Sequence, residues 1–173
     1  RFTFVVGMRL HFLVFAALFP IINPVGGAPI FLAMTSAYTE AERASLARQV
    51  SVNAFMLLLA SVATGSYVLE FFGLSVPVVQ VGGGLVVCAL GWRLLHDPGA
   101  LDRPSPQSTV PRGSPAFYPL TMPLTVGPGS ISVAITIGAN HPYSVRSLLV
   151  GLPAVLIGLT LVGASIFIAY RHA

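Results

Sequence analysis

The sequence predicts an all-α polytopic membrane protein, and three observations support this fold class. Hydrophobic residues make up 55% of the 173 residues and charged residues only 8%, with a mean hydropathy of +0.85, whereas soluble domains carry about 25% charged residues. Several apolar runs reach about 20 residues, enough to cross a hydrocarbon core of about 30 Å as a helix. Two apolar segments are each interrupted by three prolines.

The first membrane helix is predicted over residues 10–37, with a break in its middle. The break holds a glycine pair and three prolines: Pro20, Pro24, Gly26, Gly27 and Pro29. Each proline removes a backbone N–H, and its ring clashes with the carbonyl four residues earlier. In hydrocarbon an unpaired backbone group costs several kcal/mol, so a break survives only where it is buried in protein or lines a polar cavity. We interpret this break as part of a binding site.

The next segments complete a first unit of three helices. Residues 38–48 are expected to form a surface loop with a short helix that Thr39 or Ser36 can cap. The second membrane helix is predicted over residues 49–69 and the third over residues 74–95. The third contains Gly82, Gly83 and Gly84, and glycines in a membrane helix predict the close approach of a neighbouring backbone.

The second part of the chain follows a polar linker. Residues 96–115 are rich in proline and polar side chains, so they cannot bury enough apolar area to order themselves and are predicted to be flexible. The fourth helix is expected over residues 116–140, broken between Pro119 and Gly129. The fifth is expected over residues 146–170.

The two breaks repeat each other. Both read P-x3-P-x4-P, and the second set lies 99 residues after the first: Pro20, Pro24 and Pro29, then Pro119, Pro123 and Pro128. An aromatic residue, Phe19 or Tyr118, precedes each set. This match indicates an internal duplication.

The duplication predicts an inverted repeat of three helices in each half, because a unit with an odd number of spans makes the next unit enter the bilayer from the opposite face. The first repeat would cover residues 1–95 and the second residues 116–173, which holds two of its three helices. Five spans are therefore expected in this chain, and six in the natural protein.

Charge placement predicts the orientation in the membrane. All nine basic residues are arginines that stand singly at the ends of apolar runs, which is the pattern of membrane loops and not of a nucleic-acid surface. Six are expected on one side and three on the other. The more basic side is predicted to be cytoplasmic, which places the linker in the cytoplasm and the N-terminus outside.

The paired motifs NPVGGAPIF and PLTMPLTVGPGSI resemble those of the MarC family of bacterial and archaeal inner-membrane proteins. The resemblance covers nearly the whole chain. It implies an inner-membrane protein with six spans, related to the LysE-like exporters, and a family that includes transporters of small neutral amino acids. The chain departs from that pattern in lacking a sixth helix.

Two broken helices that meet in mid-membrane would offer main-chain dipoles to a solute. The start of a half-helix carries about half a positive charge and the end of one the opposite, which suits a zwitterion. No Asp, Glu or Lys is expected at mid-depth, so a neutral amino acid such as glycine, alanine or serine is favoured over a charged solute. The candidate substrate-binding residues are Asn23, Gly26, Gly27, Thr125, Gly127, Gly129 and Ser130.

Several of these residues have alternative interpretations. Asn23 can cap the second half-helix, and loss of transport in Asn23→Ala with intact membrane insertion would support its contact with the solute. A sodium site could use Asn23 and Thr121, and a proton-coupled carrier would need a titratable group. Tyr38, Trp92, Tyr118 and Tyr170 fit an aromatic belt at the membrane interfaces. The lone Cys88 and the spacing of other residues predict no metal site and no cofactor.

The functional prediction is a secondary transporter of small neutral amino acids that works by alternating access. The alternative is a channel or exporter of other small metabolites of the LysE-like type. An enzyme is not expected, because the sequence has no H-E-x-x-H or G-x-S-x-G motif and no lysine.

Overall fold

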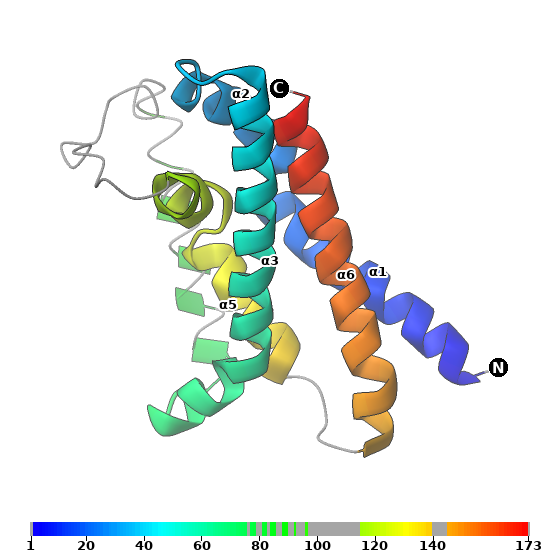
Figure 1. Ribbon diagram of the computed structural model, residues 1–173. Coiled ribbons are helices and arrows are strands. Elements are labelled where there is room, and N and C mark those ends of the chain that lie inside the picture. Colours follow the sequence, from blue (N-terminus) through cyan, green and yellow to red (C-terminus); the bar gives the residue numbers. More distant parts are fainter. Residues whose placement is uncertain are drawn as a thin grey trace.

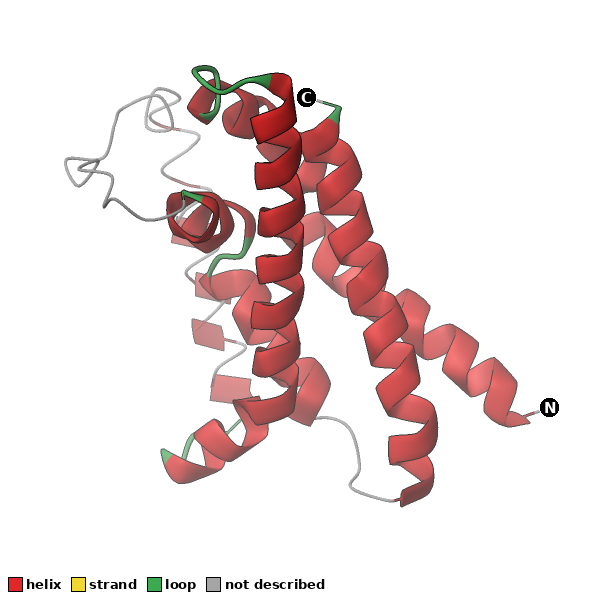
Figure 2. Cartoon of the chain, viewed as in Figure 1, coloured by secondary structure: helices red, strands yellow, loops and turns green. Residues whose placement is uncertain are grey.

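A computed structural model describes residues 2–75, 115–139 and 145–172, with positions 77, 78, 81, 82, 84, 85, 88, 89, 92 and 96. Within these residues every regular element is a helix and no strand forms (Figure 2), as predicted. The elements are α1 (Phe2–Ile22), α2 (Pro24–Met34), α3 (Glu40–Phe71), η2 (Ala116–Thr125), α5 (Pro128–Ala139) and α6 (Val145–Arg171). Almost all of the predicted linker lies outside the described residues.

A break at Asn23 separates α1 from α2. Asn23 has φ 45° and ψ 62°, a left-handed conformation that asparagine adopts more readily than most residues. The two halves are bent by 43°, so the predicted break is confirmed. Only Pro24 starts a new helix, however, because Pro20 and Pro29 lie inside α1 and α2. A single proline removes one backbone hydrogen bond, and membrane helices can continue through it where neighbouring groups replace that bond.

The second break lies between η2 and α5, which are bent by 76°. Tyr118 and Met122 have extended conformations inside η2, as expected for residues that precede a proline. Their peptide bonds to Pro119 and Pro123 are cis. The predicted interruption between Pro119 and Gly129 is confirmed, and η2 itself is irregular.

The helix α3 differs from its prediction. The expected surface loop with a short helix is instead continuous with the second membrane helix, so α3 is a single helix of 32 residues. Of the two expected caps, Thr39 is the one that forms: the Thr39 hydroxyl accepts a hydrogen bond from the Glu42 N–H at 3.4 Å, and the Glu42 carboxylate accepts from the Thr39 N–H at 2.8 Å. This reciprocal cap starts the helix early, and no proline follows to end it before the membrane segment.

The helix α3 packs against η2, α5 and α6, and α6 packs in turn against α1 and α2. Figure 1 shows α3 and α6 side by side, with α5 and α1 flanking them. The core holds residues from α1, α2, α3, η2, α5 and α6, including Leu18, Phe31, Leu58, Leu120, Ala134 and Ile166. This packing brings the two bent pairs together, since α2 contacts η2 and α1 contacts α5.

Close helix contacts occur at glycines other than those predicted. A Cβ at Gly138 of α5 would overlap the Val62 carbonyl oxygen of α3, and one at Gly158 of α6 would meet Val14 of α1. Outside the local helix backbone, no atom of the described residues lies within 4 Å of a Cβ placed at Gly82 or Gly84, so this part of the chain does not show the predicted close approach at these two positions. Gly83 lies outside the described residues.

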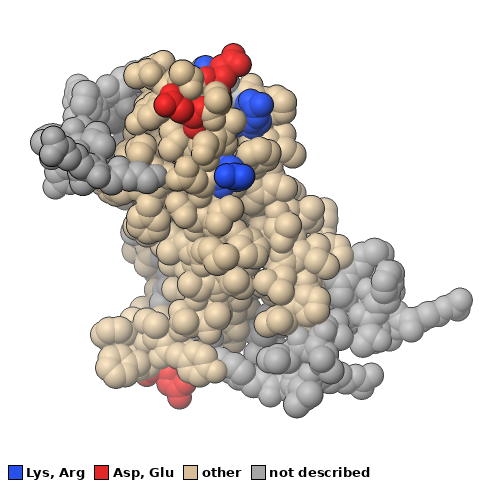
Figure 3. Space-filling model, in the orientation of Figure 1, with Lys and Arg blue, Asp and Glu red and all other residues tan. Residues whose placement is uncertain are grey.

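Among the described residues, two helical segments are long and apolar enough to cross a membrane, Glu40–Gly65 and Gly151–Arg171. The number rises to four if each bent pair is counted as one span. On the face shown in Figure 3, charged side chains gather at one end of the molecule, further acidic atoms lie at the opposite end, and uncharged residues fill the region between them. This distribution agrees with a helical membrane protein.

Candidate functional site

The first break is built around the Asn23 side chain. Its Oδ1 accepts a hydrogen bond from the Gly26 N–H at 3.2 Å, which satisfies one of the free N–H groups at the start of α2. The capping interpretation is therefore confirmed. Asn23 and Gly26 are both exposed, and contact of either with a solute stays a prediction.

Gly27 faces the interior at the start of α2. A Cβ at this position would lie 2.7 Å from the Tyr170 hydroxyl oxygen and 3.5 Å from the nearest ring carbons of Tyr170. Separations under 3.0 Å force a neighbour to move. The absence of a side chain at Gly27 is therefore what lets α2 and the last turn of α6 come this close.

The second break has three buried hydroxyl groups, and each is already engaged. Thr121 donates to the Ala116 carbonyl at 2.6 Å, and Thr125 lies 2.7 Å from the Leu120 carbonyl. Ser130 donates to the Gly127 carbonyl at 2.9 Å. Gly129 is also buried. A hydroxyl that donates its proton to a carbonyl still has oxygen lone pairs that can accept a hydrogen bond or bind a cation. Contact of Thr121, Thr125 or Ser130 with a solute or a sodium ion stays a prediction.

Tyr170 joins the two breaks, and the sequence interpretation missed it. Its hydroxyl lies 2.9 Å from the Thr125 hydroxyl, and its ring stacks on Phe31 of α2 with centroids 4.5 Å apart. The side chain is only 2% exposed. The prediction that Tyr170 belongs to the interfacial aromatic belt was wrong.

A helical pattern points to Tyr170 in retrospect. Leu159, Val162 and Ile166 are fully buried on α6, and Tyr170 continues that row four residues later. The pattern was hard to see because the other faces of α6 are apolar too.

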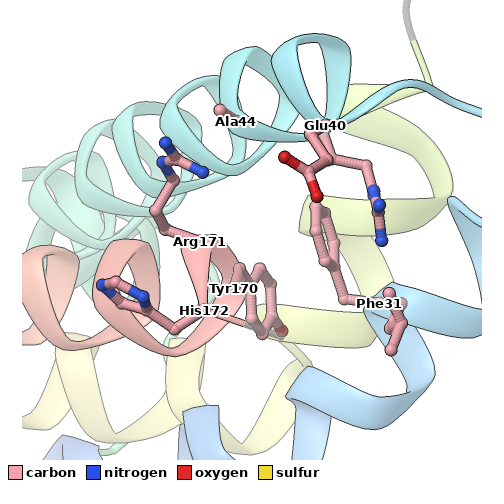
Figure 4. Close-up of a pocket in the computed structure, with 8 residues that line it drawn as sticks. Phe31, Glu40, Ala44, Tyr170, Arg171 and His172 are labelled. Carbon is pink, nitrogen blue, oxygen red and sulfur yellow. The ribbon is translucent and has the colours of Figure 1, made fainter.

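Two cavities adjoin these elements. One of about 220 Å³ is formed by α2, the start of α3 and the end of α6, and Phe31 and Tyr170 line it (Figure 4). The other, of about 610 Å³, is lined mainly by apolar side chains beside the second break, among them Met122, Pro123 and Pro128. Among the described residues, no group of three or more His, Cys, Asp or Glu could hold a metal ion.

Comparison with known proteins gives consistent matches. The sequence model of the MarC family integral membrane proteins matches residues 8–173. Membrane protein YvbG of Bacillus subtilis is 29% identical over 164 residues, which cover 92% of this chain and 75% of the relative. A membrane protein of Archaeoglobus fulgidus is 31% identical over 154 residues, which cover 87% and 71%.

The inner membrane protein MarC of Escherichia coli is 33% identical over 126 residues, which cover 69% of this chain and 57% of the relative. No solved structure matches the chain.

Proposed function

Because the chain belongs to the MarC family of integral membrane proteins, we propose that it is a secondary transporter of small neutral amino acids, such as glycine, alanine and serine. It would work by alternating access in the inner membrane, to which the name of its Escherichia coli relative also assigns that protein. The N-terminus would lie outside and the linker in the cytoplasm.

The meeting of the two breaks at Tyr170 supports this function more than any other observation. The Tyr170 hydroxyl lies against Gly27 in the first bent pair and against Thr125 in the second. The start of α2 and the end of η2 therefore lie beside the same side chain. Their N–H groups attract a carboxylate and their carbonyl groups attract an ammonium.

The charge distribution favours a solute with no net charge. The charged side chains that the structure describes belong to the two ends of α3 and the end of α6: Glu40, Glu42, Arg43, Arg48, Glu70 and Arg171. Within the described residues, neither break has a charged side chain that could act as a counter-ion. A charged solute would be costly at such a position in a membrane.

The direction of the two bent pairs supports an inverted repeat. In Figure 1 the chain rises from its N-terminus through α1 to α2, and it descends through η2 and α5. Opposed halves with broken helices are the arrangement on which many alternating-access transporters are built.

The larger cavity favours the alternative function. Its lining is almost entirely apolar, with Ile131, Ile135 and Val126 beside the prolines of the second break. An exporter or channel for a less polar metabolite would use such a surface to exclude water from its solute.

Counterflow in proteoliposomes tests the proposal. Vesicles preloaded with unlabelled glycine should accumulate labelled glycine and alanine faster than labelled leucine, and the dependence on pH and on sodium would identify the coupling ion. Protein-free vesicles and vesicles preloaded with sucrose are the controls. No exchange of any of the three amino acids under these conditions would contradict the transporter.

A further inference from the structure

The cavity of about 220 Å³ has a different character from the breaks, because charged side chains line it. It lies where α2, the first turn of α3 and the last turn of α6 meet, and its charged lining comes from Glu40 and Arg43 of α3 and Arg171 of α6. Pockets for drug-sized ligands span about 300–1,000 Å³, so this cavity suits a small ligand.

The floor of the cavity is aromatic and held in place. Phe31 and Tyr170 stack with an interplanar angle of 13° and are 0% and 2% exposed. The Tyr170 ring is also fixed by the hydrogen bond of its hydroxyl to Thr125. This packing fixes the shape of the cavity at its aromatic base.

The rim of the cavity carries charges of both signs. In Figure 4 the Glu40 side chain lies beside the Phe31 ring, and the Arg171 side chain lies apart from it, to the left. An arginine fork binds a carboxylate or phosphate with two parallel hydrogen bonds, and a carboxylate binds an ammonium.

We propose that this cavity binds a small zwitterion, with its anionic group at Arg171 and Arg43 and its ammonium at Glu40. Both a free amino acid and the headgroup of an ethanolamine phospholipid have this chemistry. The inference rests on the proposed function, which it deepens: the cavity would be the site where the solute is held on the cytoplasmic side. Tyr170 would connect that site to the breaks, because the same side chain lines the cavity and contacts Thr125 and Gly27.

Binding of labelled glycine to the full chain in nanodiscs tests the proposal directly. Glycine should be displaced by alanine, and much less by acetate or methylammonium, which each carry only one of the two charges. Arg171→Gln and Glu40→Gln should each weaken glycine binding by about tenfold or more, because each removes a hydrogen bond between charged groups. Arg171→Lys should restore part of the affinity.

Matched controls come from exposed charges of α3 outside the cavity. Arg48→Gln and Glu70→Gln remove the same kinds of charge from positions that do not line it, so glycine affinity should stay unchanged. Binding of phosphoethanolamine to the same variants is measured as well. If Arg171→Gln and Glu40→Gln bind glycine like these controls, and phosphoethanolamine binding does not depend on the two residues either, the proposal is overturned.

Lipid composition separates the two sources of the zwitterion. If the headgroup occupies the cavity, adding phosphatidylethanolamine to phosphatidylglycerol nanodiscs should weaken glycine binding in the wild type, and direct binding of phosphoethanolamine should depend on Arg171 and Glu40. If the free amino acid is the ligand, phosphatidylethanolamine should leave glycine binding unchanged. Either result supports a zwitterion site when both residues are required.

Transport measurements distinguish failure of this inference from failure of the proposed function. If the wild type exchanges glycine and neither Arg171→Gln nor Glu40→Gln changes the KM, the transport function stands and the proposed binding site in the cavity is refuted. If the wild type binds glycine and both residues are required for binding, but no exchange is seen, the binding site stands and the proposed transport function is refuted.

Discussion

The hydroxyl groups of Tyr170 and Thr125 lie 2.9 Å apart, between the last turn of α6 and the end of η2. The same Tyr170 hydroxyl lies against Gly27 at the start of α2. One side chain therefore contacts an element of each bent pair. Any movement of one pair relative to the other has to change these contacts, so Tyr170 is the most informative position to alter.

Tyr170→Phe removes the hydroxyl and keeps the ring that stacks on Phe31. Loss of a buried hydrogen bond should lower the stability by about 0.5–1.5 kcal/mol, measured by thermal unfolding in detergent. The KM for glycine exchange should rise several-fold, because the two breaks lose the bond that aligns them. Tyr38→Phe is the control, since Tyr38 is exposed. Equal KM values for the two variants would contradict a role of the Tyr170 hydroxyl in the site.

Gly27→Ala tests how closely α2 approaches Tyr170. The new Cβ would stand 2.7 Å from the Tyr170 hydroxyl oxygen, so the variant should be less stable by about 1–3 kcal/mol, as for other overpacked sites. Without the hydroxyl, the nearest atoms of residue 170 would lie 3.5 Å away, an ordinary contact.

The double variant Gly27→Ala with Tyr170→Phe should therefore be more stable than the sum of the single effects predicts. The difference from additivity, measured by unfolding of all four proteins, should be about 0.5 kcal/mol or more. Strict additivity would show that the two positions do not contact each other in the membrane.

Substitutions at Asn23 separate its capping role from contact with the solute. Asn23→Ala loses the side-chain acceptor and places alanine at φ 45°, which should cost about 1–3 kcal/mol from the cap and the left-handed conformation together. Asn23→Asp keeps an acceptor for the Gly26 N–H and a residue that tolerates this conformation.

Transport by Asn23→Asp decides between the two roles. If Asn23 only caps α2, this variant should insert and exchange glycine like the wild type. If Asn23 contacts the solute, the added negative charge should repel the carboxylate and raise the KM at least several-fold. Both can be read from counterflow at equal amounts of inserted protein.

Gly138→Ala should disrupt the contact between α3 and α5. The Cβ would overlap the Val62 carbonyl oxygen, and because this is backbone it can move only if the helices separate, which should cost about 1–3 kcal/mol or more. Gly84→Ala is the matched control: outside the local helix backbone, no atom of the described residues lies within 4 Å of its Cβ, so the higher helix propensity of alanine should leave stability equal or raised by up to about 1 kcal/mol. Similar unfolding temperatures for both variants would contradict the close approach of α3 and α5.

Much of the fold could be predicted from the sequence because the signals are local. Proline chemistry located both breaks, and the extended conformations of Tyr118 and Met122 follow from the prolines that come next. Asn23 was correctly interpreted as a cap. Thr39 was also a correct cap, but the length of α3 was not predicted, since charged residues at 40–43 suggested a separate surface helix where the chain simply continues.

The sequence by itself determined the membrane class, the helical content and the positions of the two breaks, because composition, length and proline act on the backbone where they stand. Only the tertiary structure decided that Tyr170 turns inward to Thr125 and Gly27, and that Gly138 and Gly158 make close contacts between helices. The physical reason is that a membrane helix is apolar on the side facing lipid as well as on the side facing protein. Periodicity therefore does not distinguish the two sides, and the partner of each face is chosen by packing.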